Sequence, residues 1–227
     1  MKKINRKLLR RFVMYILVIG AVVSVLSGCE KPADTVWLGE GEAEIVLAAD
    51  TVRYVAGYQG GLSAAGILDI PMVKAVWMES GGKPVLLCAV DCVGLAAGTV
   101  EKLRDAIQDV LPEKTEIHVV STHSHAAPDT LGLWGPTGID GKVPEDMEAL
   151  LDAAVAAGRA AYDDRRTGRF AFAAADCRDL IEDTRQPAVF DGKAYVFRFQ
   201  PDDGAVDTRL VLFPAHAEAL GGGNPWI

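Results

Sequence analysis

The sequence predicts an α/β fold, in which helices flank a mixed, largely parallel sheet. Short apolar runs of strand-like length recur along the chain, and two longer segments repeat apolar residues with a helical period. The run at 84–90 is apolar at almost every position, which is typical of a central strand covered on both faces. A helical segment and a second strand at 116–121 follow it, so we expect a βαβ unit with a parallel strand pair.

Seven apolar runs are candidate strands. They lie at residues 43–48, 71–78, 84–90, 117–120, 170–174, 194–199 and 210–213. Gly81 and Gly82 separate the second run from the third, and a Gly-Gly pair suits a tight turn between antiparallel strands. We therefore expect these two runs to form a β-hairpin.

Two segments are candidate helices. The first ends at Pro112, since proline cannot continue a helix. The second begins at Pro144, and Glu145 and Asp146 are favourable near a helix N-terminus. The apolar stripes are Val100, Leu103, Ile107, Val110 and Leu111 in the first segment and Met147, Leu150, Leu151, Ala154 and Val155 in the second.

The first 28 residues have the layout of an export signal. Six Lys and Arg precede an apolar stretch at 12–23, and Leu26-Ser27-Gly28-Cys29 follows it. This ending resembles the lipobox of bacterial lipoproteins, in which the cysteine is lipidated and becomes the first mature residue. An uncleaved membrane anchor is the alternative, because the stretch is almost long enough to span a bilayer. Both interpretations place the protein in the bacterial cell envelope, outside the cytoplasm.

The rest of the chain is expected to form a tether at 29–40 and one domain at 41–227. Loss of residues 1–28 would remove six positive charges and move the formal net charge from −8 to −14. A body this acidic is a poor binder of nucleic acid. It would also be repelled by anionic lipids, so we expect membrane attachment through lipidated Cys29.

Three cysteines follow Cys29. An odd number leaves at least one thiol free or paired with another chain. Cys88 lies in an apolar run and is expected to be buried. A bridge between Cys92 and Cys177 is compatible with an oxidising envelope. No Cys-x-x-Cys pair exists, which excludes a zinc ribbon.

Three of the four histidines fall within eight residues, and the fourth follows another apolar run. His123 and His125 are two residues apart, so an extended segment would point both imidazoles to one side, as a metal site requires. His118 alternates with apolar neighbours inside a strand and is expected to be structural. Ligands gather at the carboxyl ends of strands in α/β sheets. We therefore expect Asp91, His123 and His216 to meet at this edge of the sheet.

Other metal and nucleophile motifs fit less well. A metallo-β-lactamase would need His-x-His-x-Asp-His, whereas Ala126-Ala127-Pro128 follows His125. A His-x-His amidohydrolase would need a (β/α)₈ barrel of typically about 250 residues. The sequence contains no Gly-x-Ser-x-Gly elbow and no P-loop.

The order of motifs over residues 38–227 resembles the neutral (non-lysosomal) ceramidases and their bacterial relatives. That family carries, in order, Gly-Tyr, Ser-x-Asp-x-x-Gly-Leu, Thr-His-Thr-His-Ser-Gly-Pro, Asn-Arg-Ser-Pro and Phe-x-x-His before Asn. The matching segments here are Gly57-Tyr58, Val90-Asp91-Cys92-Val93-Gly94-Leu95, Thr122-His123-Ser124-His125-Ala126-Ala127-Pro128, Thr184-Arg185-Gln186-Pro187, and Phe213-Pro214-Ala215-His216 with Asn224.

The resemblance implies a zinc-dependent amide hydrolase that splits N-acylsphingosine into a fatty acid and a sphingoid base, with zinc-activated water as the nucleophile. It implies that His123 and His216 are zinc ligands and that His125 contacts the substrate or the developing oxyanion. It assigns Arg185 to the polar head of the substrate or to the bound water. Without the resemblance, Arg185 would be interpreted as a surface ion pair with Asp183.

Two departures from the family bear on function. Ala126-Ala127 replaces Ser-Gly after the second histidine, and Thr184-Arg185-Gln186-Pro187 replaces Asn-Arg-Ser-Pro. The family's remaining zinc ligands, a glutamate and a tyrosine, lie well beyond its later histidine. We therefore interpret the chain as the N-terminal part of a longer, ceramidase-like catalytic domain. The alternatives are a catalytically incomplete envelope lipoprotein that binds metal or a partner, and an enzyme of the same fold that acts on a small soluble amide.

Overall fold

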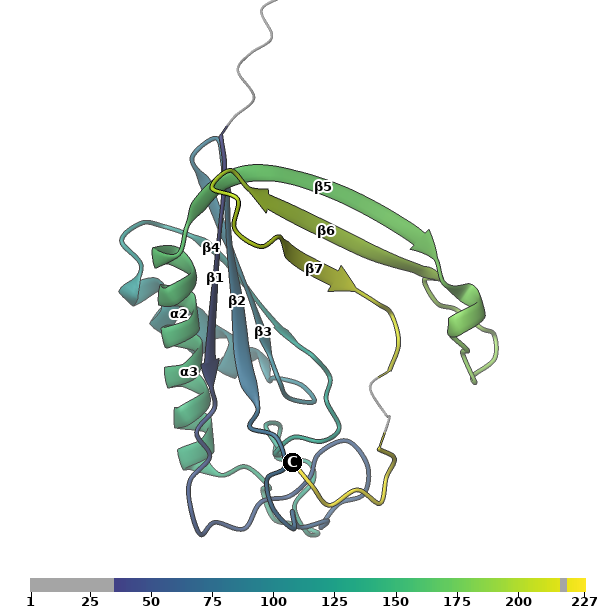
Figure 1. Ribbon diagram of the computed structural model, residues 1–227. Coiled ribbons are helices and arrows are strands. Elements are labelled where there is room, and N and C mark those ends of the chain that lie inside the picture. Colours follow the sequence, from purple (N-terminus) through teal and green to yellow (C-terminus); the bar gives the residue numbers. More distant parts are fainter. Residues whose placement is uncertain (1–34, 217–219) are drawn as a thin grey trace, which may run out of the picture. The chain divides into compact units, whose positions relative to one another are not determined.

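The computed structural model describes residues 35–216 and 220–227 (Figure 1). The expected export signal, Cys29 and residues 29–34 of the expected tether lie outside the described residues. Within the described part, no helix is long and apolar enough to cross a membrane. The elements are β1 (Val36–Glu44), β2 (Met72–Ser80), β3 (Lys83–Val90), α2 (Ala97–Val110), β4 (Glu116–Ser121), α3 (Pro144–Asp163), β5 (Arg166–Asp176), the short 3-10 helix η1 (Arg178–Leu180), β6 (Lys193–Pro201) and β7 (Thr208–Leu212).

The strands form one mixed seven-stranded sheet in the order β4-β3-β2-β1-β5-β6-β7. The predicted α/β class is confirmed, and so is the βαβ unit, because β3 and β4 are parallel and α2 connects them. The expectation that most pairs would be parallel is not met, since the other five pairs are antiparallel. Short connections such as the β2–β3 turn can join only antiparallel neighbours.

The turn between β2 and β3 confirms the predicted hairpin. Ser80 pairs with Lys83, which leaves Gly81 and Gly82 as a two-residue loop. Their φ angles are 60° and 69°. Two successive positive φ values suit a type I′ turn, whose twist matches that of the flanking strands.

The two predicted helices are confirmed, and both lie on the same side of strands β1–β4 (Figure 1). Helix α3 packs most extensively on β1 and β2, and α2 packs on α3 and β4. Gly39 and Gly41 permit the close approach of α3, because a Cβ at either position would lie 2.1 Å from a helix carbonyl oxygen. The core between sheet and helices includes Trp77, Leu86, Cys88, Leu103, Ile107, Leu150, Ala154 and Ala157.

Strand β3 is not covered on both faces in the described part of the chain. Leu86, Cys88 and Val90 are buried beneath the helices, whereas the side chains that alternate with them are only partly buried.

Strand β1 begins at Val36, so the chain enters the sheet within the segment expected to be a tether. The run predicted as a strand at 43–48 contributes only its first two residues. The helix-facing side of this strand contains Gly39 and Gly41, which add no apolar side chain to the pattern. The usual period-two signal is therefore weak, and the strand was missed.

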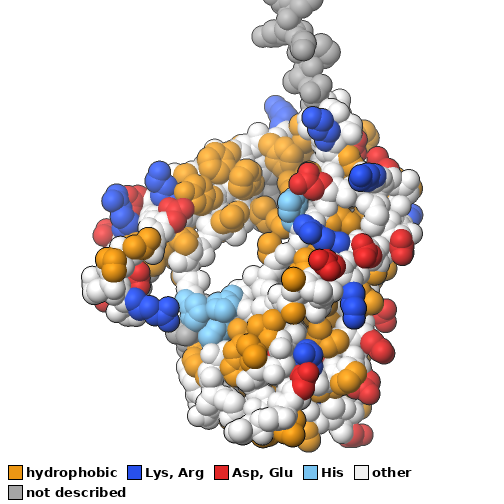
Figure 2. All heavy atoms as spheres, turned by 180° about the vertical axis from the view of Figure 1, so that it is seen from behind, with side chains coloured by type: hydrophobic (Ala, Val, Ile, Leu, Met, Phe, Trp, Pro, Cys, Tyr) orange, Lys and Arg blue, Asp and Glu red, His pale blue; other side chains and the backbone are white. Residues whose placement is uncertain are grey.

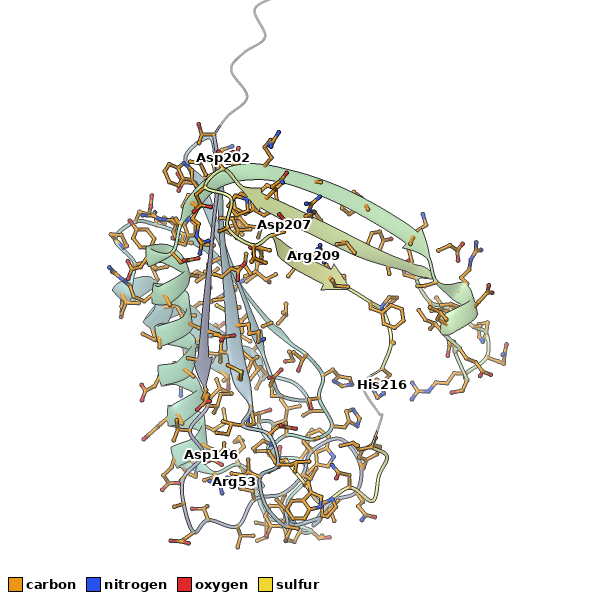
Figure 3. The ribbon with its side chains drawn as sticks, viewed as in Figure 1. Arg53, Asp146, Asp202, Asp207, Arg209 and His216 are labelled. Carbon is orange, nitrogen blue, oxygen red and sulfur yellow. The ribbon has the colours of Figure 1, made fainter. Side chains whose placement is uncertain are left out.

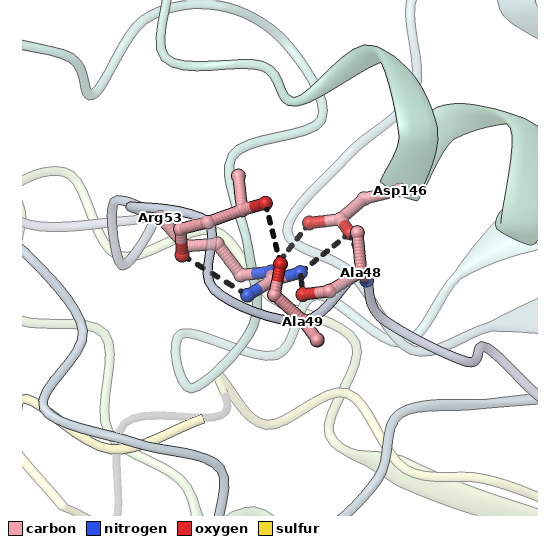
Figure 4. A network of polar contacts seen from close by, with 5 residues as sticks. Ala48, Ala49, Arg53 and Asp146 are labelled. Atoms are coloured by element: carbon pink, nitrogen blue, oxygen red, sulfur yellow. Dashed lines mark hydrogen bonds and ion pairs between the residues drawn. The ribbon is translucent and has the colours of Figure 1, made fainter.

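A buried ion pair connects the loop after β1 to the first turn of α3 (Figures 3 and 4). Arg53 Nε lies 2.6 Å from Asp146 Oδ2, and Arg53 Nη2 lies 2.8 Å from Asp146 Oδ1. The same guanidinium donates to the carbonyl oxygens of Thr51 and Ala48, and the Ala48 N–H donates to Asp146. This network fixes the loop beside the helix and so supports the adjacent segment at 54–58.

Candidate metal centre

Three histidines meet beyond the ends of β4 and β7. His123 and His125 follow β4, and His216 lies four residues after β7. One ring nitrogen of each lies within 4.8 Å of the others. The Nε2 atoms of His123 and His216 are 2.8 Å apart, and those of His123 and His125 are 3.4 Å apart. The rings form one patch at the surface (Figure 2), and the labelled His216 comes from the segment after β7 (Figure 3).

His123 is held in an unusual backbone conformation and in one ring tautomer. Its φ is 61°, a region that residues other than glycine rarely adopt and that is common at functional sites. Its Nδ1 lies 2.6 Å from the carbonyl oxygen of Val93, which can only accept a hydrogen bond. Nδ1 therefore carries the proton, and a neutral ring presents the Nε2 lone pair to the other histidines. Metal-binding histidines are commonly oriented by such a bond.

The carbonyl group of Gly94, one residue after the Val93 carbonyl that orients His123, has hydrogen-bond partners of its own. Thr130 Oγ1 donates to the carbonyl oxygen of Gly94 at 2.5 Å. The Cys92 thiol lies 3.7 Å from that oxygen and 3.5 Å from Ser121 Oγ. Burial raises the pKa of the Cys92 thiol, so it remains protonated and can donate. Sequence reasoning did not assign a role to Val93 or Thr130.

His125 is buried, with 7% of its surface exposed, and it lies against the segment 54–58. The Tyr58 ring contacts it edge to face, with the centroids 4.8 Å apart. A Cβ at Gly57 would lie 2.4 Å from His125 Nδ1, and this glycine has a φ of 104°. Gly57-Tyr58 is one of the segments that resemble the ceramidase motifs, and the sequence predicted no role for it. The structure indicates that this pair shapes the space for the His125 ring.

The loop after the histidines is organised by a buried carboxylate. Asp129 is 2% exposed and accepts hydrogen bonds from the backbone N–H groups of Leu131, Gly132 and Trp134. Its own N–H donates to the carbonyl oxygen of Tyr54. Asp129 therefore holds together the two loops that surround His125 and is not one of the grouped donors.

The three imidazoles fit a late first-row metal ion. Tetrahedral zinc with bonds of about 2.0–2.1 Å to nitrogen places two ligand nitrogens about 3.3 Å apart. The two separations from His123, 2.8 and 3.4 Å, bracket that value, and the three nitrogens together lie within 4.8 Å, so the rings would have to move to meet one ion. Imidazole nitrogen suits zinc, copper, iron and nickel. A further donor would have to complete a four-coordinate shell.

Not every residue expected at the site lies there. Asp91 accepts a hydrogen bond from the Met72 N–H and extends the β2–β3 ladder, so it is not grouped with the histidines. His118 is exposed on β4, and its Nε2 lies 3.1 Å from Glu116, which agrees with the structural interpretation.

Arg185 lies exposed in the loop between η1 and β6. Its backbone N–H donates to Asp183 Oδ1 at 3.0 Å. The N–H groups of Val189 and Arg185 together lower the pKa of Asp183. This backbone hydrogen bond ties Arg185 to its own loop, and its assignment to a substrate stays a prediction.

The cysteines Cys88, Cys92 and Cys177 are all free thiols and all buried, so the Cys92–Cys177 bridge is not formed. Burial raises the pKa of the Cys88 thiol to about 12, in agreement with its predicted place in the core.

A cavity of about 260 Å³ adjoins the histidine loop. Its polar lining includes Asp91 and Ser124, the residue between the two histidines. The apolar lining comes partly from the end of the chain, where Trp226 pairs with Gly66 and Ile227 is buried. The cavity provides space for part of a ligand beside the metal centre.

The fold and the site together define an α/β protein with a three-histidine candidate metal centre. No protein-family model matches the sequence, and no curated protein matches it. The structure of a neutral ceramidase from Pseudomonas aeruginosa matches with a TM-score of 0.68 and 18% identity, over 86% of this chain and 34% of that chain. A ceramidase complexed with C2 matches with a TM-score of 0.67 and 18% identity, over 82% and 32%. The chain thus has the fold of about one third of a ceramidase.

Proposed function

We propose that this protein is an exported, lipid-anchored, zinc-dependent amide hydrolase of the neutral ceramidase type, or part of one. The observation that carries the proposal is the convergence of three histidine nitrogens within 4.8 Å on a sheet with the fold of neutral ceramidase. The order of motifs along the sequence supports the same activity. Cys29 would carry the lipid anchor in the bacterial envelope.

In this proposal His123 and His216 hold the zinc ion through Nε2. Bound zinc supplies a Lewis acid and a water molecule of lowered pKa. The Val93 carbonyl keeps the proton on His123 Nδ1, so that Nε2 stays available as a ligand. His125 lies against Gly57 and Tyr58, and one of its ring N–H groups would donate a hydrogen bond to the developing oxyanion of the amide. Arg185 would contact the polar head of the substrate.

A metal-binding or interaction module without catalysis is the second candidate function. One observation favours it: the donors grouped in the described residues are imidazoles alone. If His125 serves as a third ligand, no histidine of the group is left for the oxyanion. The two functions therefore differ in the role of His125.

Hydrolysis by the full chain with zinc tests the proposal. A fluorescent short-chain N-acylsphingosine and a small soluble N-acyl amide would be supplied, and the released amine would be measured. We expect His125→Ala to keep its zinc and lose at least about 100-fold in hydrolysis, as loss of an oxyanion donor does. His118→Ala, outside the group, should match the unaltered protein. Zinc binding without hydrolysis of either amide, or loss of zinc in His125→Ala, would favour the module.

A further inference from the structure

Strands β5, β6 and β7 have one aromatic face. The strand registers place Phe170 opposite Phe199, and Phe172 opposite Phe197. They also place Tyr195 opposite Leu212, and Phe197 opposite Leu210. Directly paired residues lie on the same face of a sheet. We call this set the aromatic face: Phe170, Phe172, Tyr195, Phe197, Phe199, Leu210 and Leu212.

The opposite face of the same strands carries no aromatic ring: it has small and polar side chains together with Val196 and Val211. Residues that alternate with the aromatic face include Ala171, Ala173, Arg198 and Arg209. Arg198 pairs with Asp207 at 2.5 Å. Antiparallel sheets usually turn their apolar face to a core and their polar face to water. The aromatic face is therefore the side of these strands that the sequence is built to bury.

Much of the aromatic face is nevertheless exposed in the described chain. Phe172 is 58% exposed, and Phe197 is 40% exposed. Their rings contact each other at a centroid distance of 4.9 Å, so they form a continuous surface. Figure 2 shows hydrophobic side chains gathered on one side of a hollow, with the histidines on its other side. A contiguous exposed apolar surface of this kind marks an interaction site.

The matched structures indicate what covers this surface. The chain corresponds to only 34% and 32% of the ceramidase chains whose fold it shares. About two thirds of those chains has no counterpart in the described sheet. The aromatic face also leads directly to the metal centre, because β7 ends at Leu212 and His216 follows four residues later. A polypeptide seated on this face would lie beside the three histidines.

We propose that the aromatic face is an interface for a polypeptide equivalent to the remaining two thirds of the ceramidase chains, whether joined to this chain or separate from it. The partner would present an apolar face without charge at its centre. Such docking needs neither zinc nor hydrolysis, so it can stand or fall independently of the proposed function.

Coexpression tests the interface. The full chain would be produced alone and together with the polypeptide encoded directly downstream, supplied as a separate tagged chain. We expect a one-to-one complex by light scattering after chromatography. The double variant Phe172→Asp/Phe197→Asp should weaken binding at least about 100-fold. Val211→Asp is the matched control, because Val211 is 59% exposed on the opposite face of the same strands.

Far-UV circular dichroism and zinc content of both variants would establish that the rest of the fold is intact. Equal binding by the double variant and the control would overturn the proposal. So would a chain that alone forms a dimer which the double variant dissociates, since a second copy would then be the occupant. Absence of a downstream polypeptide that binds would overturn it as well.

Discussion

Gly57 controls the space available to His125. An added methyl group would meet the imidazole at 2.4 Å from Nδ1. We expect Gly57→Ala to displace the ring and to lower amide hydrolysis at least tenfold. The positive φ adds a backbone cost of about 1 kcal/mol, which any left-handed glycine shares.

Gly204→Ala separates these two effects. Gly204 has a φ of 79°, and an added Cβ there would meet nothing within 4 Å. The control should lose similar stability in thermal unfolding and keep its hydrolytic activity. Equal activity losses in the two variants would show that the space around His125 does not matter.

Thr130 supports the backbone beside the His123 ring, because its hydroxyl donates to the carbonyl oxygen of Gly94, the residue after Val93. We expect Thr130→Val to weaken zinc binding about tenfold, as loss of an outer hydrogen-bond partner commonly does. Thr130→Ser keeps the hydroxyl and should bind zinc like the unaltered protein. Competition with a chelating indicator dye measures both dissociation constants. Identical constants for Val and Ser would contradict the positioning role.

The histidines could be found in the sequence because they are scarce and three of the four are clustered. His123 and His125 form a His-x-His pair, and His216 follows an apolar run. Val93 was not identified because it contributes only a backbone carbonyl, which every residue possesses. Thr130 was missed because its hydrogen bond spans 36 residues and depends on the path of the loop.

Among the elements, helix α3 depends on its buried ion pair with the loop after β1. Asp146→Ala would leave the Arg53 guanidinium buried without its carboxylate. We expect a loss of about 3–5 kcal/mol in the free energy of unfolding. Asp163→Ala breaks the exposed pair with Arg159 on the same helix and should cost less than about 1 kcal/mol. Urea unfolding of both variants measures the difference, and equal losses would contradict it.

The pairing of the strands could be predicted from the sequence only in part. The hairpin followed from Gly81-Gly82, and the βαβ unit followed from the order of strand, helix and strand. The antiparallel pairing of β1 with β5 could not be predicted, because apolar runs carry no information about direction. The aromatic alternation in β5 and β6 was readable in the sequence as period two, but it does not reveal which face is covered.

At the scale of the whole molecule, the described helices cover one side of strands β1–β4. The other side combines the partly buried face of β3, the aromatic face and the three histidines. The exposure of this side and the one-third coverage of the ceramidase structures both support the interface proposed above. A polypeptide docked on this side, as proposed above, would cover the aromatic face and lie beside the three histidines.

Metal content of the purified full chain tests most directly whether the two strand ends form one metal site. Mass spectrometry should find about one zinc ion per chain in the unaltered protein and in the control His118→Ala. His123→Ala and His216→Ala should each retain less than about a tenth of that amount. Zinc retained in both of these variants, or no zinc bound by the unaltered chain at micromolar supply, would contradict a metal centre built from these histidines.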